Sequence, residues 1–119
     1  MLQPMTRAET LRGFLSENGY AIRREALVRE RGILYPVMDV TGGEMRLTPG
    51  QCYGGAALSR DALGDKYLIE KILRLQNALA GLSRGRAPDN AARADELRDI
   101  LTELYQMREA WRNANRPGN

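Results

Sequence analysis

The side chains with most potential for chemistry in this sequence are arginines, because histidine is absent and Cys52 is the single cysteine. Without histidine the chain lacks the commonest general base and metal ligand, which excludes Ser-His-Asp and Cys-His catalysis within it. One cysteine cannot form an internal disulfide, and zinc would have to be held by carboxylates alone. These residue types predict neither a complete active site nor a metal site in this chain.

The positive charge lies mainly in the C-terminal half of the sequence. Residues 66–119 carry ten Lys or Arg and seven Asp or Glu, whereas residues 1–65 carry eight of each, and the net charge is +3. A basic surface attracts nucleic acid phosphates, but a solvated helical surface of mixed charge has the same composition, so both interpretations stay open. The candidate substrate-binding side chains are Arg84, Arg86 and Arg93, which are opposed only by Asp89, with Arg74 as a secondary candidate.

A glycine-containing segment in the middle of the chain is the nearest approach to a phosphate-binding loop. Its sequence, Cys52-Tyr53-Gly54-Gly55, lacks the spacing of G-x-x-x-x-G-K-[ST] and of G-x-G-x-x-G. We therefore expect residues 44–60 to form a linker loop without a binding role.

The first third of the chain predicts a helix followed by a β-hairpin. Helical periodicity indicates a helix at about 7–17, and Tyr20–Glu30 has the composition of a strand. Arg31-Gly32 is a plausible tight turn before a return strand at 33–40. Pro36 is unexpected in that strand, because proline cannot donate a hydrogen bond to a neighbouring strand.

The second half contains the clearest pattern in the sequence. Apolar residues recur at alternating spacings of four and three, as in the seam of a coiled coil: Leu68, Ile72, Leu75, Leu79 and Leu82. A break containing Gly85 and Pro88 follows, and then a matching stripe: Ala94, Leu97, Leu101, Leu104, Met107 and Trp111. A short break between two helices favours antiparallel neighbours, so residues 61–116 are expected to form an antiparallel helical hairpin.

The front part, residues 1–43, is expected to be the end of a larger α/β sheet. A two-stranded hairpin is not stable in water by itself, and its helix resembles the crossover from a strand that would precede residue 4. The helical hairpin alone is also marginal, so it should pack on the α/β part, a second copy or a partner.

Four motifs occur in order along the front part: Leu2-Gln3-Pro4, Leu11-Arg12-Gly13-Phe14-Leu15, Asn18-Gly19-Tyr20-Ala21-Ile22 and Glu25-x-Leu27-Val28-x-Glu30-x-Gly32-x-x-Tyr35. This series resembles the C-terminal half of the bacterial tRNA (adenine-N1)-methyltransferases of the TrmK type. In that family a coiled-coil helical hairpin follows the methyltransferase domain, and residues 66–115 match this description. Pro36 departs from the family pattern, in which an acidic residue is usual.

The resemblance implies a class I methyltransferase (Rossmann-like) fold that uses S-adenosylmethionine to methylate N1 of an adenine in tRNA. The family's donor-binding motifs lie in its first half and are absent here, so the resemblance implies that this chain is a fragment, a truncated gene product or one piece of a split polypeptide. The chain alone is expected to be inactive, and its catalytic residues stay unknown. Gln3 and Pro4 are implied at the active-site edge, because ligands bind at the carboxyl ends of parallel strands. The alternative is that Pro4 only sets the turn into the helix. The resemblance also implies that the helical hairpin contacts tRNA.

A non-enzymatic function stays open beside this one. The apolar seam could pair with a partner helix or with a second copy, which would make the chain an interaction or dimerisation module. No run of about 18 apolar residues occurs, and Met1–Arg12 has no signal-peptide core. We therefore expect a cytoplasmic protein without membrane association.

Overall fold

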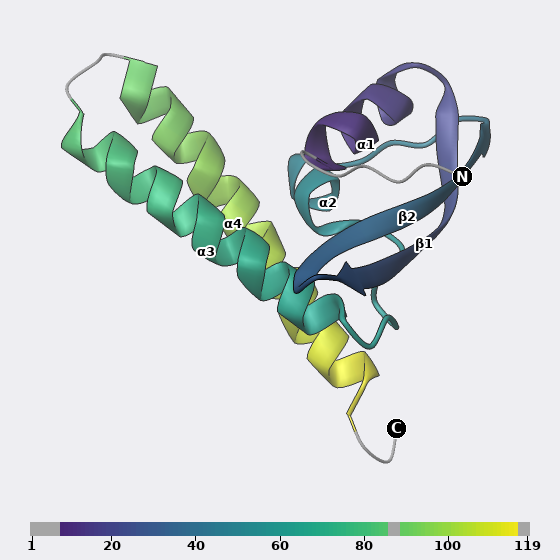
Figure 1. Ribbon diagram of the computed structural model, residues 1–119. Helices are drawn as coiled ribbons and strands as arrows, with labels where there is room; N and C mark the ends of the chain where they lie inside the picture. Colours follow the sequence, from purple (N-terminus) through teal and green to yellow (C-terminus); the bar gives the residue numbers. More distant parts are fainter. Residues whose placement is uncertain (1–7, 86–88, 117–119) are drawn as a thin grey trace.

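The computed structural model describes residues 8–85 and 89–116, which form a small α/β body and a long helical arm (Figure 1). The body contains α1, β1 and β2, the arm consists of α3 and α4, and the short helix α2 lies between them. The elements are α1 (Ala8–Glu17), β1 (Tyr20–Glu30), β2 (Ile33–Gly42), α2 (Pro49–Gly54), α3 (Gly64–Arg84) and α4 (Asp89–Ala114).

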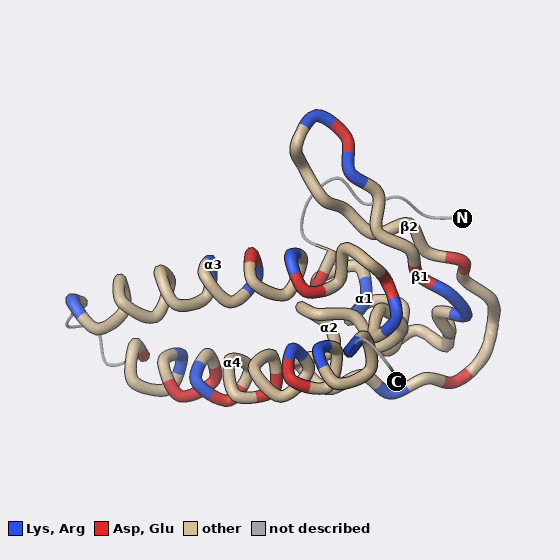
Figure 2. Tube along the Cα trace, turned by 90° about the horizontal axis from the view of Figure 1, so that it is seen from below, with Lys and Arg blue, Asp and Glu red and all other residues tan. Residues whose placement is uncertain are grey.

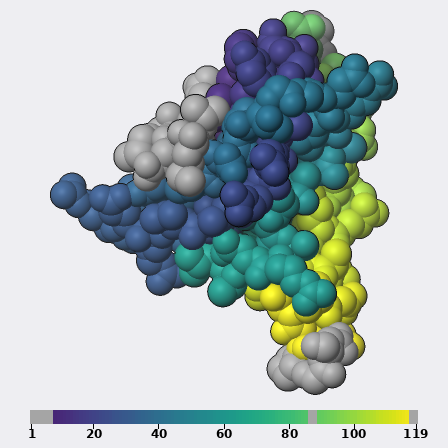
Figure 3. Space-filling model, turned by 90° about the vertical axis from the view of Figure 1, so that its right-hand side faces the viewer, coloured from purple at the N-terminus to yellow at the C-terminus, as the bar shows by residue number. Residues whose placement is uncertain are grey.

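The β-hairpin has the strands and turn that the sequence predicts, although β2 runs two residues further than expected. Arg31 and Gly32 both have positive φ, 54° and 78°, as the two central residues of a type I′ turn require. A bulge between Ile22 and Arg24 interrupts the antiparallel register. The hairpin projects from the surface of the body (Figure 3), with α1 packed against one of its faces.

Pro36 is accommodated because the backbone nitrogen at this position faces the outer edge of the hairpin and not β1. Leu27 is its partner on β1, and the Leu27 N–H donates to Asp61 Oδ2 at 2.9 Å instead of to β2. Opposed residues in an antiparallel pair either exchange both hydrogen bonds or neither. The proline therefore removes no bond from the β1–β2 ladder.

The arm is the antiparallel helical hairpin that the periodicity predicts. Its core contains seam residues from both helices together with Ile100, and the fully buried side chains include Leu97 and Leu104. Leu79, Leu82, Met107 and Trp111 pack against this core and are partly buried. No helix in residues 8–85 and 89–116 is long and apolar enough to cross a membrane.

The expected linker contains a helix, α2, which the sequence analysis did not predict. Thr48 begins it with a capping box, in which the Thr48 hydroxyl accepts from the Gln51 N–H and the Gln51 side chain accepts from the Thr48 N–H. A Cβ atom on Gly50 would lie 2.4 Å from Glu103 Cβ, and one on Gly54 would lie within 3 Å of α3 and α4 side chains. The glycines of this segment therefore permit close packing of α2 on the arm.

Candidate functional site

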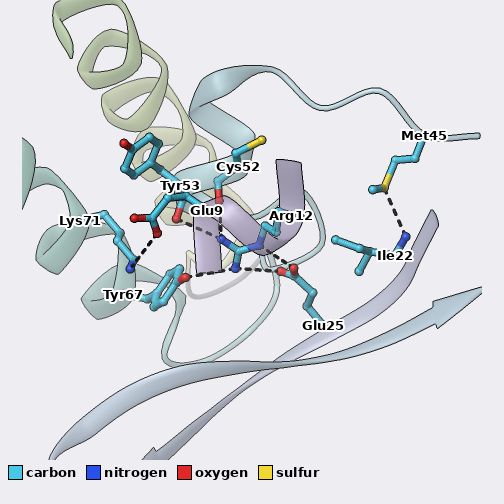
Figure 4. Close-up of polar contacts among 9 residues, drawn as sticks. All are labelled: Glu9, Arg12, Ile22, Glu25, Met45, Cys52, Tyr53, Tyr67 and Lys71. Atoms are coloured by element: carbon cyan, nitrogen blue, oxygen red, sulfur yellow. Dashed lines mark hydrogen bonds and ion pairs between the residues drawn. The ribbon is translucent and has the colours of Figure 1, made fainter. Parts of the chain in front are cut away.

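A buried polar cluster occupies the place where α1, β1, α2 and α3 meet (Figure 4). Its centre is Arg12, whose side chain has no exposed surface. The Arg12 Nε donates to Glu25 Oε1 on β1 at 2.7 Å, and Nη2 donates to the Tyr67 hydroxyl on α3 at 3.1 Å. Arg12 and Glu25 lie in two of the motifs that define the family resemblance, and the structure joins them in one ion pair.

Arg12 also closes the C-terminal end of α2. Its Nη1 donates to the carbonyl oxygens of Cys52 at 2.7 Å and Tyr53 at 3.2 Å. Carbonyls in the last turn of a helix lack hydrogen-bond partners within the helix and carry partial negative charge. A guanidinium group there supplies both hydrogen-bond donors and a favourable positive charge. One guanidinium group thus holds side chains or backbone of β1, α2 and α3.

A second cation, Lys71, lies beside this cluster. Its Nζ is 5.0 Å from the centre of the Tyr67 ring and 4.0 Å from Glu9 Oε2. Burial, followed by repulsion from Arg74, lowers the pKa of Lys71 to about 8, although Glu9 opposes this shift. Burial also raises the pKa of Tyr67, although Arg12 opposes that shift.

The Arg12 cluster, defined as Arg12, Glu25, Tyr67, Lys71 and Glu9, is a joint between elements rather than a reaction centre. Arg12 is fully enclosed, and its donors are occupied by protein acceptors. A closed ion pair of this kind gives a substrate no access. The Arg12–Glu25 pair lies within the body, and the hydrogen bond from Arg12 to the Tyr67 hydroxyl joins this pair to α3 of the arm.

An open cavity of about 500 Å³ lies next to the cluster, between α1, α2 and α4. Five carboxylates line it: Glu9, Glu17, Glu96, Asp99 and Glu103. Arg93 is the one base among its described lining residues, and its Nη1 lies 2.8 Å from Glu96 Oε2. Hydrogen bonds to Glu96 and to Tyr53 raise the pKa of Arg93. A cavity of this charge repels phosphate groups.

The described candidate arginines, Arg84, Arg93 and Arg74, lie in different surroundings. Arg84 lies at the end of α3, is exposed, and makes no ion pair within the described part of the chain. Arg93 is paired with Glu96, which the sequence analysis did not count as an opposing charge. Arg74 Nη1 lies 3.8 Å from Glu9. Three further predicted site residues lie outside the described residues: Gln3, Pro4 and Arg86.

The Arg12 cluster was not predicted as a site, although one signal for it exists in the sequence. Ala8, Arg12 and Leu15 are the buried residues of α1, and their spacing of four and three places them on one helix face. An arginine on the apolar face of a helix needs a buried partner. That partner, Glu25, could not be identified from spacing because it lies on another element.

Comparisons with known proteins agree with this architecture. The profile of the TrmK family, tRNA (adenine(22)-N(1))-methyltransferase, matches residues 1–106. The Bacillus subtilis tRNA methyltransferase TrmK has a similar structure, with a TM-score of 0.73 and 22% identity over 90% of this chain and 50% of that one. Streptococcus pneumoniae Sp1610, solved in complex with S-adenosyl-L-methionine, has a TM-score of 0.66 and 23% identity over 90% of this chain and 45% of that one. No curated protein matches the chain.

The chain therefore belongs to the TrmK family, as its motifs predict, and it spans about half the length of these solved structures. An uncharacterized protein from Listeria monocytogenes gives the same result, with a TM-score of 0.67 and 23% identity over 89% of this chain and 49% of that one. These likenesses confirm the α/β methyltransferase fold class with a helical hairpin.

Proposed function

We propose that this member of the TrmK family is the C-terminal portion of an S-adenosylmethionine-dependent tRNA (adenine-N1)-methyltransferase. The observation that carries the proposal is the family match, which spans both the body and the arm. In this proposal the body completes the catalytic domain and the arm contacts tRNA. In this proposal the residues that bind S-adenosylmethionine lie outside these 119 residues.

The proposed contact with RNA lies at the far end of the arm, where Arg84 is exposed and makes no ion pair in the described part of the chain. The two helices together carry no excess of positive charge, because α3 has four Lys or Arg and two Asp or Glu, whereas α4 has four Lys or Arg and six Asp or Glu (Figure 2). The side of α4 that faces the body lines the acidic cavity, where Arg93 is already paired. The proposal assigns phosphate contacts to Arg84, which is exposed at the end of α3, and to Arg86, two positions further along the sequence. Arg93 and Arg74 are secondary candidates.

A titration of this chain with a tRNA transcript, followed by fluorescence anisotropy, tests the proposal. Neutralising phosphates releases counterions, so we expect affinity to fall steeply as salt rises. The double variant Arg84→Ala and Arg86→Ala should bind several-fold more weakly and with a shallower salt dependence, because two phosphate contacts are lost. Arg24→Ala, on the exposed face of β1, is the matched control and should bind like the parent chain.

Two results would contradict the proposal. Absence of tRNA binding at low salt would remove the arm from the substrate interface. Binding of S-adenosylmethionine to this chain alone, measured by calorimetry, would show that the donor site is formed by residues within this chain.

Self-association through the seam stays a prediction. The seam residues Leu68, Leu75, Leu97 and Leu104 are buried between α3 and α4, so pairing through them would require the arm to open. Light scattering of the purified chain measures the oligomeric state directly.

A further inference from the structure

The short helix α2 is held at both ends by charges that come from different parts of the molecule. At its first turn, Glu103 of α4 accepts hydrogen bonds from the Thr48 hydroxyl and, at 3.2 Å, from the Gly50 N–H. At its last turn, Arg12 of α1 donates to the Cys52 and Tyr53 carbonyls. A carboxylate suits the partially positive start of a helix, and a guanidinium suits its partially negative end. The arm therefore holds one end of α2 and the body holds the other.

The packing around α2 leaves little room for it to shift. Gly50 lies against Glu103, and Gly54 lies against Leu68, Leu104 and Met107 of the arm, at distances that no Cβ atom could occupy. Interiors at this density transmit displacement instead of absorbing it. A movement of α1 would consequently reach α4 through α2.

Direct contacts between the body and the arm occur on α3, where Tyr67 meets Arg12 and where Lys71 and Arg74 face Glu9. Tyr67 also belongs to a buried apolar cluster with Leu27 and Leu34 of the hairpin. Two of the polar contacts are loose, because Lys71 Nζ and Arg74 Nη1 lie 4.0 Å and 3.8 Å from the Glu9 carboxylate. Contact to α4 passes through α2 and Glu103 instead. α2 thus gives the arm a second point of support, and two points fix a direction that one point leaves free.

We infer that α2 is a strut that fixes the direction of the helical arm relative to the body, and that Arg12 and Glu103 are positioning residues for the RNA that the arm contacts. The second clause rests on the proposed function, whereas the first does not.

The length of the arm makes its direction important. Glu103 and Asp89, at the start of α4, are separated by about 20 Å along the helix axis at 1.5 Å per residue. A rotation of about 10° at Glu103 would therefore move the far end of the arm by about 4 Å, which exceeds the length of a hydrogen bond, about 3 Å. Without the strut, phosphate contacts at that end would no longer lie at a fixed distance from the body.

The strut is tested by measuring distances between the body and the arm with double electron–electron resonance. Spin labels are attached to Thr41→Cys on β2 and Ala80→Cys on α3, both exposed, in a Cys52→Ser background that removes the native thiol. We expect a narrow distance distribution for this labelled parent. Glu103→Ala should broaden it at least twofold, and Glu103→Gln, which keeps an acceptor, should broaden it less.

Glu109→Ala is the matched control, because Glu109 is an exposed glutamate on the same helix that makes no contact with α2 in the described structure. It should leave the distribution unchanged. Arg12→Lys tests the other end of the strut and should also broaden the distribution. Equal widths for the parent, Glu103→Ala and Arg12→Lys would overturn the inference.

Binding of tRNA by the same variants separates positioning from direct contact. Glu103→Ala should leave the affinity of this chain for tRNA within about twofold of the parent and its salt dependence unchanged, since the proposed phosphate contacts at the tip are all retained. A shallower salt dependence would contradict the positioning role. If the parent chain binds no tRNA, the proposed function fails, and the distance measurement still decides whether α2 is a strut.

Discussion

The two ends of the helical arm differ in how they are held. At the root, where α3 begins and α4 ends, Trp111 Nε1 donates to the Asp61 carbonyl at 2.8 Å and Arg108 Nε lies 2.8 Å from Asp65. At the tip, where α3 ends and α4 begins, Leu82 is only partly buried and Asn90 donates to its carbonyl at 3.3 Å. The difference shows that the same apolar seam runs through both ends of the arm, although the root is attached to the rest of the chain and the tip is an exposed charged surface.

The largest expected effect comes from the Arg12 cluster at the root. Arg12→Ala should lower the free energy of unfolding by about 3–5 kcal/mol, because Glu25 would be left as a buried, unpaired charge. Urea denaturation measures this change. Arg24→Ala removes the surface Arg24–Asp39 pair between β1 and β2 and should cost less than about 1 kcal/mol. Equal effects of the two substitutions would refute the assignment of the Arg12 cluster as the main joint.

Substitutions of leucines in the arm test whether the root is packed more closely than the tip. Leu104 has no exposed surface and lies at the level of α2, so Leu104→Ala should destabilise the chain by about 2–5 kcal/mol. Leu82→Ala, at the partly buried tip, should cost less than half as much, because its side chain loses less contact. Thermal or urea unfolding gives both values. A larger cost at Leu82 would mean that the tip, rather than the root, is the better packed end.

The pH dependence of stability tests the burial of Lys71. Its folded pKa of about 8 lies below the usual value of 10.5, so between these pH values the unfolded chain binds more protons. The Lys71 contribution to the free energy of unfolding therefore rises with pH across this window, by no more than about 3 kcal/mol. Above pH 10 the raised pKa of Tyr67 acts in the opposite direction.

The measurement is the free energy of unfolding of the parent chain minus that of Lys71→Met, followed between pH 7 and 10. This difference should increase with pH. A flat difference would show that the Lys71 ammonium is solvated, which would contradict a closed root.

A pair of glycine substitutions gives the smallest effects, with opposite signs. Gly54→Ala should destabilise the chain by about 1–3 kcal/mol, because its Cβ would overlap Met107, Leu104 and Leu68. Gly81 lies inside α3 toward the tip, and its Cβ would meet nothing within 4 Å, so Gly81→Ala should stabilise by about 0.5–1 kcal/mol. Melting temperatures that fall for both variants would contradict the open tip.

Sequence reasoning predicted the parts of the fold that local pattern controls. The arm follows from apolar spacing along α3 and α4, and the hairpin follows from the turn at Arg31-Gly32. α2 could not be predicted in this way, because a six-residue helix is too short to be stable from its own residues. Its stability depends on Glu103 and Arg12, which are distant in sequence.

In the candidate site, too, contacts between residues that are distant in sequence could not be predicted. Arg93 and Glu96 are three residues apart on one helix, so their pairing could have been inferred from spacing. The pairing of Arg12 with Glu25 crosses from α1 to β1, and only the tertiary structure brings the two together.

Amide chemical shifts of this chain, recorded by NMR while tRNA is added at low salt, locate the RNA contact on the arm residue by residue. Shift changes should appear around Arg84, Gly85 and Asn90 at the tip, and none at Arg12 or Glu25. Changes concentrated at the Arg12 cluster with an unperturbed tip would contradict the proposed contact.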